Sequence, residues 1–75
     1  MAENIWLDGW YAEVEDARGA ARFFISEGVK EVELIQSTHG TFGAVYCASE
    51  PVSPNHTWQD RVNGLQDAVL VEKIA

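Results

Sequence analysis

The residue types that most often carry out chemistry are few in this sequence, and they form no recognisable catalytic arrangement. The single cysteine, Cys47, lies within the apolar run Phe42–Ser49, which is the setting of a buried and inert thiol. Neither His39 nor His56 has a serine, a cysteine and an acid arranged around it as a nucleophilic site requires. We therefore expect a protein that is not an enzyme.

Metal and cofactor sites also find little support in the sequence. His56 and Asp60 are four residues apart and could share a helix face, but two ligands do not complete a metal site. Gly40 and Gly43 have the spacing of a turn rather than that of a loop that cradles phosphates. One cysteine excludes both an intramolecular disulfide and a zinc site built on cysteine pairs. We expect no metal and no cofactor.

Carboxylates are the chemical groups that this sequence has in excess. Its 75 residues include 12 acidic and 5 basic side chains, which gives a formal net charge of −7. So few basic residues cannot neutralise a nucleic-acid backbone, which argues against direct binding of DNA or RNA. The surplus instead suits a partner protein with a basic surface, because complementary potentials steer association.

The elements that must position these groups fit one domain. Hydrophobic residues make up 47% of the chain, which is too apolar for a disordered acidic tail, and the length suits one small acidic α+β domain over residues 1–75. Residues 1–9 are expected to form an extended lead-in that ends at a turn. The alternation over Trp10–Glu15 predicts a half-buried strand with Trp10 in the core.

An apolar stripe predicts a helix over Ala17–Glu27, with Asp16 as its N-cap and Gly28 at its end. The stripe has helical spacing and consists of Ala17, Ala20, Ala21, Phe24, Ile25 and Gly28.

The rest of the chain predicts a hairpin, a short helix and a final strand. Alternation over Val29–Ser37 and the apolar run Phe42–Ser49 indicate two strands joined by a turn. Thr57 with Asp60 resembles a capping box and predicts a second helix, which ends near residues 63–64. Its apolar stripe would be Trp58, Val62 and Leu65. Residues 68–74 read as a closing strand, so the order β-α-β-β-α-β predicts a ferredoxin-like α+β sandwich, with an antiparallel sheet and two helices on one face.

In this arrangement one face of the sheet gathers the acidic groups. That face would carry Tyr11, Glu13, Glu15, Glu31, Glu33 and Ile35. Three uses of it are open: a solvated surface that prevents edge-to-edge aggregation, a docking site for a basic partner, or a hard-cation site. Trp6, in the lead-in, would either pack over the sheet as a flap or anchor a partner.

In size, acidity, predicted fold and lack of catalytic motifs, the chain resembles some anti-CRISPR proteins. That resemblance implies a phage-type inhibitor that masks the nucleic-acid-binding surface of its target. Two alternatives are open: a dimeric regulatory domain that binds a small molecule near residues 39–42, and a small accessory subunit of a larger enzyme. A homodimer through the sheet face or the C-terminal strand is a further expectation.

Two absences concern localisation. No apolar stretch approaches the roughly 20 residues needed to span a bilayer, and the first residues lack the features of a secretory signal. We therefore expect a cytoplasmic protein that does not contact membranes.

Overall fold

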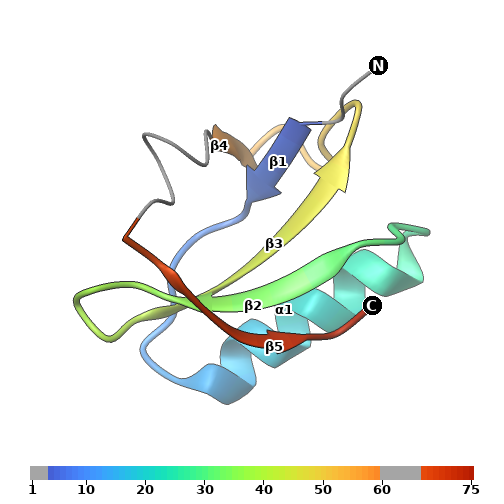
Figure 1. Cartoon of the computed structure of the whole chain (residues 1–75). Coiled ribbons are helices and arrows are strands. Elements are labelled where there is room, and N and C mark those ends of the chain that lie inside the picture. Colours follow the sequence, from blue (N-terminus) through green and yellow to red (C-terminus); the bar gives the residue numbers. More distant parts are fainter. Residues whose placement is uncertain (1–3, 60–66) are drawn as a thin grey trace.

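Five strands and one helix make up the part of the chain that the computed structural model describes, which is residues 4–59 and 67–75 (Figure 1). In chain order these elements are β1 (Asn4–Leu7), α1 (Val14–Ser26), β2 (Val32–Gln36), β3 (Phe42–Ala48), β4 (Thr57–Gln59) and β5 (Val69–Lys73). The predicted α+β class is confirmed.

The strands form one antiparallel sheet in the order β4-β1-β3-β2-β5. The predicted β2–β3 hairpin is confirmed, with Val32 opposite Tyr46 and Gln36 opposite Phe42. β1 pairs with β3 on one side and β4 on the other, so the expected lead-in contains a strand of the sheet. The predicted closing strand is also confirmed, since β5 pairs with β2 and forms one edge of the described sheet (Figure 1).

The helix begins earlier than the sequence pattern predicted, and the strand predicted over residues 10–15 is wrong. Tyr11 makes only an isolated bridge to Phe42, and α1 starts at Val14 after an extended Glu13. Asp16 lies in the first helical turn rather than at the N-cap, and a carboxylate there interacts favourably with the helix dipole. The alternation predicts the wrong element because its last two residues, Val14 and Glu15, belong to the first turn of α1.

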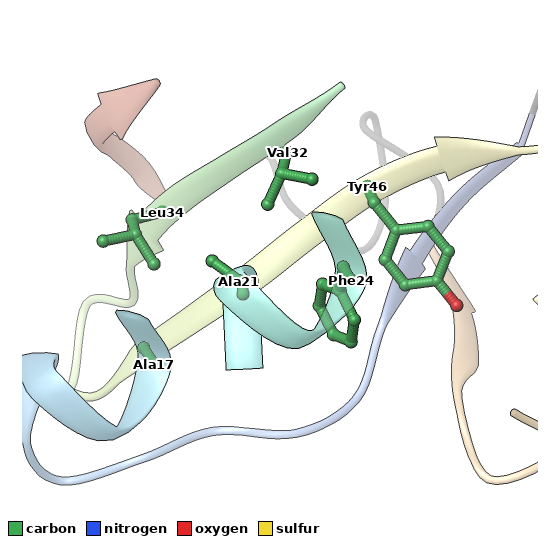
Figure 2. Close-up of a cluster of buried hydrophobic side chains, with 7 residues drawn as sticks. Ala17, Ala21, Phe24, Val32, Leu34 and Tyr46 are labelled. Carbon is green, nitrogen blue, oxygen red and sulfur yellow. The ribbon is translucent and has the colours of Figure 1, made fainter. Parts of the chain in front are cut away.

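The main hydrophobic core lies between α1 and the sheet. Ala17, Ala21 and Phe24 of the predicted stripe are buried, whereas Ile25 is 39% exposed, and the small alanines allow α1 to approach the strands closely. The buried residues of this cluster are Ala17, Ala21, Phe24, Val32, Leu34, Ala44 and Tyr46. Figure 2 shows the helix residues directed toward β2 and β3, with Tyr46 at the edge of the cluster.

A second, smaller core lies on the sheet face opposite α1. It contains the buried side chains of Leu7, Ile35 and Val45, against which Ile5 and Ala68 pack. Ile35 is only 6% exposed. The expectation that Ile35 would be exposed among glutamates is therefore wrong, and this face is not simply solvated.

The second predicted helix is not confirmed. Residues 57–59 form β4, which pairs with β1, and residues 60–66 lie outside the described part of the chain. Pairing with a strand more than 50 positions away in the sequence outweighs the local capping signal at Thr57. In the residues that the structure describes, no helix combines the length and the apolar character needed to cross a membrane.

Candidate functional site

The structure separates the four glutamates that the sequence placed on one sheet face. Glu31 precedes β2 and Glu33 lies within it, whereas Glu13 and Glu15 lie at the start of α1. Glu15 forms an ion pair with Arg18, in which Oε1 lies 3.4 Å from Nε. The same arginine also forms an ion pair with Glu72 of β5. The predicted four-carboxylate face is therefore wrong, and only Glu31 and Glu33 remain together.

Tyr11 stabilises the segment between β1 and α1. Its backbone exchanges two hydrogen bonds of 2.7 Å with Phe42, and its hydroxyl donates to a carboxylate oxygen of Asp8. This bond, assisted by burial, raises the pKa of Tyr11 to about 12. Tyr11 thus has a structural role in the position where a partner contact was predicted.

The two N-terminal tryptophans have different surroundings from those predicted. Trp6 packs against the main core, and its Nε1–H donates to the Ala48 carbonyl at 3.0 Å. Trp10, predicted to be buried, is 42% exposed. Its ring lies beside Gly43, where a Cβ atom would come within 3.2 Å of the indole.

Two hollows lie near the beginning of β2 and the end of β3, the smaller along the sheet between β1 and β5 and the wider at the end of α1. The smaller, of about 100 Å³, is lined by Ile5, Glu31, Glu33, Val45, Tyr46, Cys47 and Lys73. The wider and more open one, of about 550 Å³, is lined by Glu27, Gly28, Val29, Lys30, Glu31, Cys47, Ala48, Glu50 and Val52. We call the two together the acidic groove. Glu31 and Cys47 line both hollows, so the two adjoin at these residues.

Local structure explains how separate segments deliver carboxylates to the acidic groove. Gly28 adopts a positive φ of 92°, which ends α1 and turns the chain toward β2. The Cys47 amide then donates to the Glu31 carbonyl at 3.2 Å, which holds the approach to β2 against β3. Glu27 therefore comes from the helix end, Glu31 and Glu33 from the region of β2, and Glu50 from the loop after β3.

The electrostatics of the acidic groove are negative, with some compensation. Its four carboxylates, Glu27, Glu31, Glu33 and Glu50, are accompanied by two lysines. Lys73 lies directly opposite Glu33 in the β2–β5 ladder, where opposite charges favour pairing of the strands. Valine and alanine side chains provide apolar surface between the charges.

Cys47 is half-buried rather than fully buried as predicted, because it lines both hollows of the acidic groove. The charged side chains that line the smaller hollow with it are Glu31, Glu33 and Lys73. Among the residues with described positions, no group of three or more histidine, cysteine and acidic side chains is arranged to hold a metal ion. The chemistry that this arrangement supports best is electrostatic and apolar binding of a cationic side chain.

A buried polar contact next to the groove was missed by sequence reasoning. The Tyr46 hydroxyl lies 2.5 Å from His56 Nδ1 and accepts a 2.8 Å hydrogen bond from the Val52 amide. The Phe24 ring packs against both, with centroid distances of 4.6 Å to Tyr46 and 5.3 Å to His56. Burial raises the pKa of Tyr46. The apolar run around Tyr46 predicted its burial, but no sequence pattern indicated His56 as its partner.

Comparisons of the chain with protein-family models, with curated proteins and with solved structures find no match. The function is therefore inferred from the acidic groove and its surroundings.

Proposed function

We propose that this protein is a small, non-enzymatic binding module that docks its acidic groove onto a basic surface of a partner protein. The observation that carries the proposal is that four glutamates from three chain segments line two adjoining hollows, with Glu31 common to both. Glutamates that served only to keep the surface solvated would not need to gather around a concavity with apolar walls.

The physical properties of the groove suit lysine and arginine side chains. Their aliphatic stems can lie along Val29 and Val52 while the charged ends approach the carboxylates. The net charge of −7 adds long-range attraction, which steers a basic partner before contact. Salt weakens this attraction, because the Debye length is only about 8 Å at physiological ionic strength.

A more specific version of the proposal is a phage-type, anti-CRISPR-like inhibitor that masks a nucleic-acid-binding surface of its target. An acidic surface presents negative charge as a nucleic acid does, so the two compete for one basic site. The groove favours this version over a small-molecule site near residues 39–42. That hairpin turn lies at the opposite end of β2 and β3 from the groove.

We also propose that the fold is a variant of the ferredoxin-like sandwich. The support is the split β-α-β unit, in which β3 lies between β1 and β2 and α1 connects those two strands. In this variant β4 follows β3 at the position where a second helix was expected, and β5 extends the sheet beyond β2.

A direct test measures the binding of a fluorescently labelled arginine- and lysine-rich peptide by anisotropy, at low and at physiological salt. The double variant E31Q/E50Q removes two groove carboxylates. The matched control E13Q/D16N removes the same charge from exposed residues at the start of α1. We expect the groove variant to lose roughly 3- to 10-fold in affinity and the control less than about 2-fold, given the usual strength of exposed ion pairs.

Two outcomes contradict the proposal. Equal losses in both variants would show that net charge, rather than the groove, governs binding. Affinity that does not change between the two salt concentrations would contradict the electrostatic mechanism. For the inhibitor version, the unmodified protein must also release a DNA oligonucleotide from the same peptide more effectively than E31Q/E50Q does.

A further inference from the structure

Tyr46 connects the loop after β3 to the main core. The side chain is 1% exposed, and its ring packs on Phe24 of α1. Figure 2 shows the hydroxyl directed away from the alanines of the core. There it contacts two loop groups, the Val52 amide and the His56 ring. One hydroxyl therefore holds both the middle and the end of the loop.

The donors and acceptors of this contact define one protonation pattern. The Val52 amide can only donate, so the Tyr46 oxygen accepts that bond. We assign the hydroxyl proton to the contact with His56 Nδ1, because a neutral imidazole with its proton on Nε2 then leaves none of the three groups without a partner. In this state the amide, the hydroxyl and Nδ1 all have partners.

We propose that the Tyr46–His56 contact is a proton-sensitive latch on one wall of the acidic groove. Protonation of His56 turns Nδ1 into a donor, so the Tyr46 oxygen then faces two N–H donors and its own proton loses its acceptor. A buried donor without a partner is costly, which favours release of the loop. Val52 lines the groove, so release of the latch changes the shape of the surface that we propose for docking.

Charged groups on neighbouring segments act in the same direction. Glu27 at the end of α1 and Glu50 on the loop line the same hollow as Val52, so an imidazolium that moved into this hollow after leaving Tyr46 would meet negative charge. Burial, and to a smaller extent the negative charge of Asp8 after β1, raises the pKa of Tyr46 and keeps its hydroxyl protonated. The neighbours of the imidazole on β3 and α1 are the neutral Tyr46 hydroxyl and the Phe24 ring, which provide no counter-charge inside the latch.

The exchange rate of the Val52 amide hydrogen, measured by NMR on the free protein, tests the latch. We expect its protection factor, corrected for the intrinsic pH dependence of exchange, to fall about tenfold between about pH 7.5 and about pH 5, the range in which histidine ordinarily changes charge. The Phe42 amide, which donates to Tyr11 at the far end of β3, is the internal reference and should not change. In Y46F, Val52 should be weakly protected at both pH values.

Two histidine variants make the test specific. H56Q removes the imidazole, so the protection of the Val52 amide should become independent of pH. H39Q removes the histidine of the hairpin turn and should retain the pH dependence of the unmodified protein. Equal protection of Val52 at both pH values, or a pH dependence that survives in H56Q, would overturn the latch.

The consequence for docking rests on the proposed function, but the latch itself does not. The exchange measurement contains no partner, so a failed latch appears as unchanged Val52 protection whatever the groove binds. A failed docking proposal appears in the peptide titration of E31Q/E50Q with the latch still responding to pH.

Discussion

At the scale of single residues, two tyrosines organise opposite ends of β3. Tyr11 pairs with Phe42 at its beginning and donates to Asp8, whereas Tyr46 holds the loop that follows its end. Both phenols have a raised pKa, for different reasons. A hydrogen bond to a carboxylate is the main cause for Tyr11, and burial is the main cause for Tyr46.

The pKa of Tyr11 predicts an alkaline step in stability. The folded pKa of about 12 exceeds the ordinary value of 10.0, so the neutral phenol is favoured by folding. This stabilisation is complete below about pH 10 and is lost as the pH rises through about 12. In D8N the main cause of the shift is removed, so absorbance of tyrosinate should show one tyrosine ionising closer to pH 10. Identical titration curves for D8N and the unmodified protein would contradict this explanation.

At the scale of elements, α1 and β3 each contain a glycine in a different environment. A Cβ atom at Gly19, in the middle of α1, would meet nothing within 4 Å. A Cβ atom at Gly43 would lie 2.9 Å from Leu7 Cδ1 and 3.2 Å from the Trp10 ring. The first glycine therefore only weakens its helix, whereas the second permits close packing across the sheet face.

These environments predict opposite effects for the same substitution. G19A should raise the free energy of unfolding by about 0.5–1 kcal/mol, because alanine has the higher helix propensity. G43A should lower it by roughly 1–3 kcal/mol, because Leu7 and Trp10 must move to admit the methyl group. Urea unfolding of the two variants under one set of conditions measures both changes. If G43A instead had a higher free energy of unfolding, the Leu7 and Trp10 side chains would be shown to move aside without a loss of stability.

At the scale of the whole molecule, most of the acidic side chains in the described residues lie in two regions. Glu13, Glu15 and Asp16 surround the start of α1, and the carboxylates of the acidic groove lie at its other end. The helix dipole favours the first region but not the second, since Glu27 lies at the C-terminal end of α1. The groove therefore gathers Glu27, Glu31 and Glu50 where the helix dipole does not stabilise them, which supports a binding role.

This distribution predicts that salt stabilises the free protein. A chain with net charge −7 repels itself when compact, and screening reduces that repulsion. The melting temperature should rise by a few degrees between about 20 mM and about 300 mM NaCl, and the rise should be smaller in E31Q/E50Q. A melting temperature that falls with salt would show that attractive pairs such as Arg18–Glu72 outweigh the repulsion.

The homodimer expected from the sequence stays a prediction.

The spacing of apolar residues along the chain was enough to predict the elements that have a regular local pattern. The buried stripe of α1, the alternation of Val32 and Leu34 in β2, the hairpin and β5 all follow from which residues are apolar and at what spacing. Burial of Tyr46 and the pairing of Glu31 with Glu33 on one surface follow from the same patterns.

Which segments meet depends on contacts between residues far apart in the sequence. Residues 10–15 have a strand pattern, yet Val14 lies in the first turn of α1 and packs against the main core, so Glu13 and Glu15 do not lie on the predicted face. β4 formed because the edge of β1 was there to pair with it, and Glu27 and Glu50 joined Glu31 because the chain turns at Gly28 and after β3. Local spacing sets the period of an element, but free energy gained by burial and pairing between distant segments sets its neighbours. The acidic groove and the Tyr46–His56 contact consist of such neighbours, which is why no motif predicted them.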